Sequence, residues 1–421
     1  MNTIKVILGD KQLRNRILFV IGILVITRIL SIIPIPGVGI ENLANFLENN
    51  SFFGMLNIFS GGSIATFSIV MLGVGPYITA SIIMQLMTVL VPRIKEMYHE
   101  EGEAGRRRFV QYGRLMTPIF GALQGFALIT LLEKQQIIST LSASEKFSNV
   151  IIVTAGTMLM MWLGEQINER GIGNGVSLII FAGIVAAIPN QIGQFLVTFD
   201  ITQAPTIIGF IIMLVIVIAG VVFVTEAERP IPVTYAKQAR MGTSGGSLGA
   251  TTYLPLRLNQ AGVIPIIFAV SILLFPQLLS QLLATSSQQT LQAIAKFVND
   301  ALTNQVIYGS LYFFFVVAFT YFYTAVTFDP EKTADNLQKN GAFISGFRPG
   351  TATAEYIGYV LARITLVGAV FLGTVAVLPI IVQGITGITS MMVGGTSLLI
   401  VVAVVLDVIK KVDAQIAMRE Y

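Results

Sequence analysis

Residue types that carry out catalysis or bind metal ions are scarce in this chain. Its 421 residues include no cysteine and a single histidine, His99, which excludes disulfides, thiolate nucleophiles and the usual Cys/His metal sites. The run His99-Glu100-Glu101-Gly102-Glu103 lacks the spacing of a helical metal site and reads as a solvated charged loop. The run Gly171-Ile172-Gly173-Asn174-Gly175 follows a predicted helix and lacks the Lys and Ser/Thr of a phosphate-binding loop. We therefore expect no enzymatic activity, no metal ion and no cofactor.

The composition is that of a chain whose surface faces lipid. The sequence is 54% hydrophobic and 11% charged, with a mean hydropathy of +0.79, whereas a soluble domain carries about 25% charged residues. The isoelectric point near 9.2 would suit a nucleic-acid-binding protein. However, the net charge of +4 is spread over many apolar segments. We expect a lipid bilayer as the partner, and no nucleic acid read by sequence.

Apolar segments long enough to cross a bilayer recur along the whole chain. A spanning helix needs about 20 apolar residues. The first run follows a basic start, as in a signal peptide, but it ends in Pro34-Ile35-Pro36-Gly37 and not at a small-residue cleavage site, so we expect a retained helix. The predicted fold is an all-α membrane protein with ten transmembrane helices. These spans are 17–33, 67–91, 115–132, 148–164, 176–199, 205–224, 261–284, 306–328, 364–382 and 384–406.

The basic residues orient these spans. With the N-terminus inside, 22 of the 26 Lys and Arg residues fall in inside segments and 3 fall in outside segments. This bias follows the positive-inside rule and predicts that both termini are cytoplasmic. The remaining basic residue, Arg28, lies within the first span, where its side chain either snorkels towards a headgroup or packs against a partner helix.

The spans lack the groups that transporters and intramembrane enzymes use. No span contains an Asp or Glu proton carrier, and none pairs a nucleophile with a base. A secondary transporter of a small solute is the alternative function, but it needs a polar site at the midplane. An intramembrane protease is a third possibility and lacks any candidate nucleophile with its base. The chain resembles a conduit without chemistry of its own.

Five spans fall in each half of the chain, 1–204 and 205–421. An odd number per half places the halves in opposite orientation, as in inverted-repeat transport proteins. Two long inside loops, 225–260 and 329–363, are polar and rich in Gly and Pro. Each is either a linker or part of a docking platform, and their location on the same side favours the platform.

An apolar segment at 52–62 is too short to span a bilayer and lies on the outside. It is either a short helix that folds back into the protein or an interfacial amphipathic helix. Residues that interrupt helical hydrogen bonding mark weak points in two of the spans. They are Gly73, Gly75 and Pro76 in the second span, and Pro265 and Pro276 in the seventh.

Several motifs, in order from the first span to the last, resemble the SecY/Sec61 alpha family of protein-export channels, and the resemblance covers nearly the whole chain. The motifs are Ile33-Pro34-Ile35-Pro36-Gly37, Asn57-Ile58-Phe59-Ser60-Gly61-Gly62, Pro76-Tyr77-Ile78-Thr79-Ala80-Ser81-Ile82-Ile83, Glu101-Gly102-Glu103-Ala104-Gly105-Arg106-Arg107-Arg108, Met161-Trp162-Leu163-Gly164-Glu165-Gln166-Ile167, Glu169-Arg170-Gly171-Ile172-Gly173-Asn174-Gly175, Ala261-Gly262-Val263-Ile264-Pro265, Thr333-Ala334-Asp335-Asn336-Leu337 and Gly394-Gly395-Thr396-Ser397-Leu398-Leu399-Ile400.

The resemblance implies two inverted five-helix halves around an hourglass pore that a plug helix closes from outside. An apolar ring at the waist would block ions by dewetting. Matched position by position, the ring falls on Val74, Ile78, Ile180, Ile267 and Ile400. The plug, at about 52–62, would present Phe53, Met55, Leu56, Ile58 and Phe59.

The resemblance also implies a lateral gate between the second and seventh spans, with the third beside it. Gln85 and Asn174 match polar gate positions, although Asn174 also suits a turn among glycines. The inside loops would dock the ribosome or the SecA motor ATPase, and Arg348 matches a coupling arginine. Arg240 stands alone where the family usually carries a pair of basic residues, so this loop departs from the family pattern.

The function implied is the central channel subunit of the Sec translocon in the bacterial plasma (inner) membrane. It would move unfolded preproteins, recognised by a signal sequence, across the membrane and release membrane helices sideways into lipid. The expected partners are the small membrane subunits SecE and SecG, the SecA ATPase and the ribosome.

Overall fold

Ten long helices, arranged side by side, make up most of the molecule. The computed structural model describes residues 10–36, 57, 60–198, 204–235, 252–262, 264–284, 288–386 and 390–417. Each long helix corresponds to one predicted span. They are α2 (Lys11–Ile32), α5 (Gly75–Leu90), α7 (Gly102–Lys134), α8 (Ala143–Arg170), α9 (Gly175–Thr198), α10 (Ala204–Glu226), α12 (Ile264–Leu283), α14 (Gln305–Thr327), α16 (Thr351–Thr386) and α17 (Ser390–Ala417). Helix α16 runs to Thr386, so the break predicted between the last two spans at 383 is wrong.

The helices differ in how much apolar length they offer to a bilayer. By length and composition, five of the described helices can cross a membrane alone, and a sixth span results if the bent pair α5 and α6 (Pro92–His99) counts as one. Three further helices carry shorter apolar stretches, Gly175–Pro189, Ile211–Glu226 and Ile264–Gln277. Short or broken helices are tolerated at membrane depth where neighbouring protein covers their backbone.

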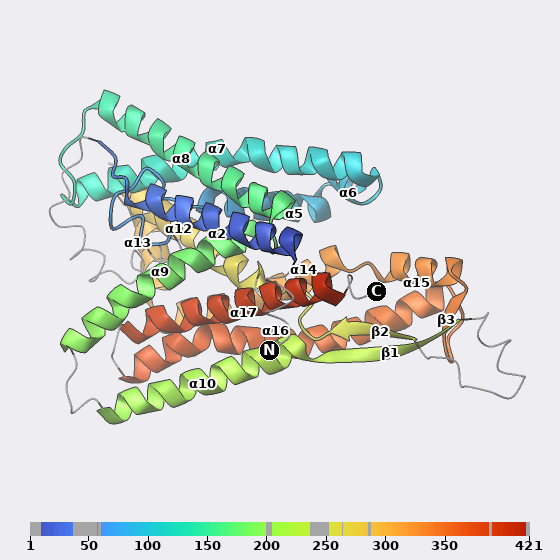
Figure 1. Ribbon diagram of the computed structural model, residues 1–421. Helices are drawn as coiled ribbons and strands as arrows, with labels where there is room; N and C mark the ends of the chain where they lie inside the picture. Colours follow the sequence, from blue (N-terminus) through green and yellow to red (C-terminus); the bar gives the residue numbers. More distant parts are fainter. Residues whose placement is uncertain are drawn as a thin grey trace, which may run out of the picture.

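Figure 1 shows how the long helices are arranged. Helices α7 and α8 lie along one edge of the molecule, α10 lies along the opposite edge, and α9 and α12 lie between. A short helix, α13 (Gln289–Thr303), lies at one end of the bundle, and α15 (Pro330–Lys339) lies at the other end beside the strands (Figure 1).

The second span begins later than its hydropathy predicts. Residues 60–74 form turns, and the helix starts only at Gly75. Two positive φ angles, 46° at Phe67 and 54° at Gly73, break the helical path before that point. Pro76 then occupies the first helical turn, where its missing N–H costs nothing. At the other end, the chain bends by 109° between α5 and α6, and Pro92 is the first residue of α6.

A three-stranded sheet joins the two long inside loops. Its strands are β1 (Glu228–Tyr235), β2 (Thr252–Arg257) and β3 (Ala342–Ile344), in the antiparallel order β2-β1-β3. Ile231, Val233 and Leu256 pack on the inner part of α16 through Ile357. The sequence did not predict these strands, because they are short and because prolines interrupt β1 and β2. In their described parts, the loops 225–260 and 329–363 thus form one folded unit and are not independent linkers.

The largest buried apolar cluster draws on helices from both halves of the chain. It contains residues of α2, α5, α8, α9 and α10, and residues of α12, α14, α16 and α17. Dispersion contacts in such a cluster are individually weak and collectively large. The middle of the molecule is therefore filled by aliphatic and aromatic side chains.

Close helix packing at Gly156 of α8 gives the first prediction. A Cβ at this position would collide with the backbone carbonyl oxygen of Ile69, whereas a Cβ at Gly113 of α7 would meet nothing within 4 Å. We expect Gly156→Ala to lower the free energy of unfolding by about 1–3 kcal/mol because a backbone atom must shift. The change would be measured by thermal unfolding of the detergent-solubilised protein.

The matched control is Gly113→Ala, which also replaces a helical glycine. It should leave stability unchanged or raise it by up to about 1 kcal/mol through helix propensity. Equal melting temperatures for Gly156→Ala and Gly113→Ala would contradict the packing of α8 on the segment that contains Ile69.

Candidate functional site

The five predicted ring residues lie in one buried cluster. Ile78 lies on α5, with Val74 at the N-cap of that helix, and Ile180, Ile267 and Ile400 lie on α9, α12 and α17. Their side chains are between 0% and 6% exposed, and all five belong to the largest apolar cluster. The structure therefore brings together five aliphatic residues that are separated by up to 326 positions in the sequence. Such a set forms an apolar barrier with no polar atom for an ion to exchange its water against.

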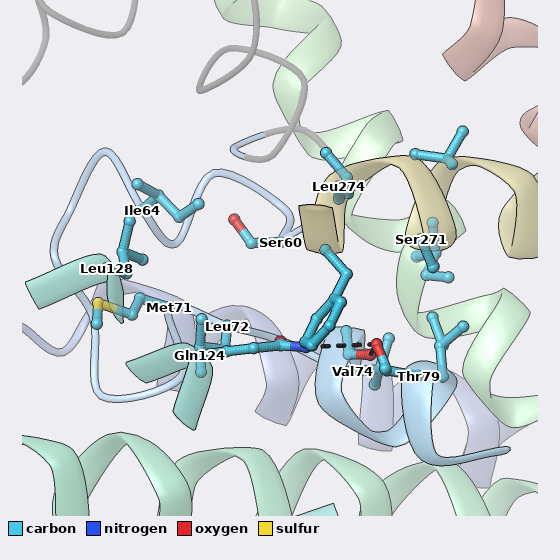
Figure 2. Close-up of a pocket in the computed structure, with 15 residues that line it drawn as sticks. Ser60, Ile64, Met71, Leu72, Val74, Thr79, Gln124, Leu128, Ser271 and Leu274 are labelled. Carbon is cyan, nitrogen blue, oxygen red and sulfur yellow. Dashed lines mark hydrogen bonds between the residues drawn. The ribbon is translucent and has the colours of Figure 1, made fainter. Parts of the chain in front are cut away.

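A cavity of about 60 Å³ adjoins this cluster. It is lined by α5, α7 and α12, by the 60–74 segment, and by ring residues Val74, Ile78 and Ile180. Figure 2 shows polar side chains around it, with the amide of Gln124 directed at Thr79. The cavity thus lies where the second, third and seventh predicted spans meet, which is the place expected for a lateral gate.

Few polar contacts hold these three helices together at the cavity. Gln124 Nε2 donates to Thr79 Oγ1 over 3.4 Å, a long hydrogen bond. The hydroxyls of Thr79 and Ser271 instead donate to carbonyl oxygens within their own helices, at 3.1 and 2.9 Å. The α5–α12 contact therefore depends mainly on apolar packing, which can separate without leaving charges unpaired.

The structure does not join the two predicted gate residues. Gln85 is half-buried on α5, and its Oε1 atom has no hydrogen-bond partner among the described residues. Asn174 precedes α9, and its Oδ1 accepts from the backbone N–H of Ser177 at 3.3 Å. Asn174 therefore acts as a helix cap, in agreement with its interpretation as a turn residue.

The glycine-rich run before α9 forms a tight helix–helix turn. Gly173 has a φ of +100°, and the N–H of Gly175 donates to Asn168 Oδ1 at 2.7 Å. A Cβ on Gly175 would collide with the carbonyl oxygen of Gly164. The glycines are thus required by close packing of α8 on α9, and their N–H groups do not form a phosphate cradle.

Sequence reasoning missed a contact made by Arg28. Its Nη1 donates to the carbonyl oxygen of Gly61 over 2.5 Å. The side chain thus packs against protein at the end of the segment that enters the bundle. The signal available in the sequence was its position as the single charge within the predicted spans.

The remaining predicted residues divide into two groups. Arg348 is exposed between β3 and α16, where its carbonyl oxygen accepts from Thr353 Oγ1 at 2.8 Å. Beside it, the rings of Phe347 and Tyr356 stack with centroids 4.0 Å apart. The predicted plug residues and the second docking arginine lie outside the described residues. These are Phe53, Met55, Leu56, Ile58, Phe59 and Arg240.

A family model and a known relative both match this chain over most of its length. The family model SecY matches residues 68–409. Protein translocase subunit SecY of Streptomyces coelicolor is 40% identical over 426 residues, which cover 97% of this chain and 96% of that relative.

Two solved structures have a similar fold. One, with a TM-score of 0.62 and 18% identity over 95% of this chain and 91% of its own, is a SecY protein whose plug domain stabilises the closed state of the translocation channel and maintains a membrane seal. The other is Sec61 in the canine ribosome–channel complex, with a TM-score of 0.60, 18% identity and the same coverage.

The Oε1 atom of Gln85, which has no partner among the described residues, gives a prediction about stability. Replacing a buried polar atom that has no partner by an apolar group of similar shape removes a desolvation cost of about 1–3 kcal/mol. We expect Gln85→Leu to raise the melting temperature. Gln124→Leu removes an amide that does bond, to Thr79, and should not raise it. A lower melting temperature for Gln85→Leu would show that the Gln85 amide is satisfied in the folded protein.

Proposed function

The chain belongs to the SecY family, and from that premise we propose that it is the conduit through which unfolded secretory proteins cross the cell membrane. It is a multi-pass membrane protein and the channel subunit of the Sec translocon. The finer assignment of pore, plug, gate and docking residues to particular positions is our proposal. We further propose that both termini are cytoplasmic, on the distribution of basic residues.

The observation that carries the proposal is the convergence of five aliphatic side chains from four helices. Val74 and its four partners fill one cluster beside a cavity. An apolar constriction of this kind dewets and stops ions, while a polypeptide that fills it can still pass. We propose that these residues form the pore ring, and that residues 1–204 and 205–421 are the two halves between which it opens.

The proposed plug and gate account for closure and sideways release. The plug would be residues 52–62, which lead into the segment that lines the cavity. The lateral gate would lie between α5 and α12, with α7 beside it. Gln85 on α5 and Asn174 at the start of α9 are its proposed polar residues, although in this structure Asn174 caps its own helix. A polar contact between membrane helices contributes only about 0.6 kcal/mol on average, so an arriving apolar signal helix can compete with it.

The inner end of the molecule is the proposed docking surface. The sheet, α15 and the first part of α16 lie together at that end (Figure 1). The similarity to a ribosome-bound Sec61 supports a translocon that binds the ribosome. We propose SecA as a second partner there, with Arg348 and Arg240 as contacts, and SecE and SecG as membrane subunits. The alternative of small-solute transport lacks a polar midplane site in the predicted spans, and we propose no catalytic activity.

Crosslinking tests the conduit directly, because the chain has no native cysteine. We expect a cysteine at Val74 to crosslink to a secretory chain stalled halfway through export. The matched control is Ile216→Cys on α10, a side chain that is 65% exposed on the outer surface of the bundle. If the secretory chain is engaged in the channel and the cysteine at Val74 crosslinks to it no more than the cysteine at Ile216, Val74 does not line the path of the exported chain.

Charge reversal tests the docking surface. We expect Arg348→Glu to slow SecA-driven export roughly tenfold, the effect of losing about 1.4 kcal/mol of interaction with the motor. Lys339→Glu is the control, because Lys339 is also exposed at this end of the molecule, on α15. Equal export rates for the two variants would remove Arg348 from the motor contact.

A further inference from the structure

A seam of hydrogen bonds ties the non-helical segment 60–74 to the outer part of α2 and the residues that follow it. The hydroxyls of Thr66 and Ser68 donate to the carbonyl oxygens of Ser31 and Leu30, each at a distance of 2.7 Å. Backbone bonds continue the seam from Ile35 to Phe67 at 2.9 Å and from Ile69 to Ile33 at 3.0 Å. Irregular backbone at membrane depth needs such partners.

Arg28 is the charged member of this seam. It is half-buried, and its Nη1 donates to Gly61 O over 2.5 Å. A hydrogen bond from an ionised donor is about twice as strong as a neutral one. An ionisable residue within a spanning helix is costly, and by default it marks a functional site. Among the described residues, the bond to Gly61 is therefore a charge-assisted tie between α2 and residues 60–62.

Gly61 fits between α2 and α9 with no room to spare. Its φ is +72°, a conformation that favours glycine, and a Cβ there would lie 2.9 Å from Gly183 Cα and 3.0 Å from Arg28 Nη1. Gly183 is one helical turn beyond the ring residue Ile180 on α9. The clamped carbonyl of Gly61 is thus held beside a helix that contributes to the ring.

The Arg28 site also touches the ring through a small cavity. This cavity, of about 10 Å³, is lined by polar side chains and by Val74. Its lining includes Thr27, Arg28, Ser31, Ser60, Gly61 and Val74. Any displacement of residues 60–62 away from α2 must break the Arg28 bond next to the apolar barrier.

We propose that Arg28 is a positioning residue that holds the closed channel, by clamping the Gly61 carbonyl against α9. The proposal rests on the proposed function and adds a residue to it. Because the Arg28–Gly61 bond exists only while residues 60–62 are in place, it weights the equilibrium towards the closed state. Loss of the bond should raise the resting open population about tenfold, the scale of one charge-assisted hydrogen bond.

The test uses the whole channel with its membrane subunits in liposomes. Resting ion conductance per channel is measured without cargo. Export is then measured for one preprotein with an intact signal and for the same preprotein with a weakened signal. We expect Arg28→Gln to raise resting conductance about tenfold and to narrow the difference between the two preproteins, because less signal binding is then needed to open the channel. Arg28→Lys keeps the charge and a donor and should restore much of the closure.

Arg16→Gln is the matched control, because Arg16 is an exposed arginine of the same helix. Resting conductance of Arg28→Gln within about twofold of Arg16→Gln would overturn the proposal. If Arg28→Gln fails to fold, Gly61→Ala tests the other partner of the bond, since it keeps the arginine and displaces the carbonyl that accepts from it. It should raise conductance as well, and an unchanged value would overturn the proposal.

The proposed function fails separately. If the unmodified channel does not export the preprotein with the intact signal, the conduit assignment is wrong whatever the conductance of the Arg28 variants. If it exports normally while Arg28→Gln stays as closed as Arg16→Gln, the conduit stands and the clamp alone is rejected.

Discussion

The constraint on which this structure depends is that a backbone inside hydrocarbon must find its hydrogen bonds within the protein. Helices meet that requirement alone, but residues 60–74 do not form one. Several of their backbone groups bond to one another or to Ile33 and Ile35, and Arg28 donates to the Gly61 carbonyl. The hydroxyls of Ser68 and Thr66 in turn donate to carbonyl oxygens at the end of α2. Because the segment is held in this way, a non-helical chain can enter the bundle and begin α5 beside the ring.

The proposed barrier at the ring has a different physical basis. Five aliphatic residues meet in a cluster that contains dispersion contacts and no bonds of fixed geometry. Such a barrier excludes water and ions when packed, and its parts can separate without stranding a charge. The cavity beside it and the long Gln124–Thr79 hydrogen bond show that α5, α7 and α12 are loosely packed where they meet. Closure by apolar packing and retention by a few polar ties together suit a channel that opens and closes.

The end of the molecule that carries the three-stranded sheet is stabilised in the same way as a soluble domain. Strands β1 and β2 come from one loop, and β1 pairs with β3 of the other loop. The resulting sheet covers apolar residues of α16. Pairing fixes one loop relative to the other, so that a partner protein meets a single surface. This arrangement links the proposed docking surface to α16, on which the sheet packs, and to α10, which β1 follows in the chain.

The sequence by itself determined the number of long helices, since transfer free energy adds up along a local window. It also predicted their orientation, because the Lys and Arg bias needs only counting. The ring positions came from the family resemblance, because an isoleucine such as Ile400 looks like any lipid-facing residue. Only the tertiary structure decided that Asn174 caps a helix, that α5 starts at Gly75, that strands join the two loops and that Arg28 binds Gly61. The sheet and the Arg28 bond depend on pairs of groups far apart in the chain, Val233 with Ile344 and Arg28 with Gly61, and a local sum of hydropathy cannot predict such contacts.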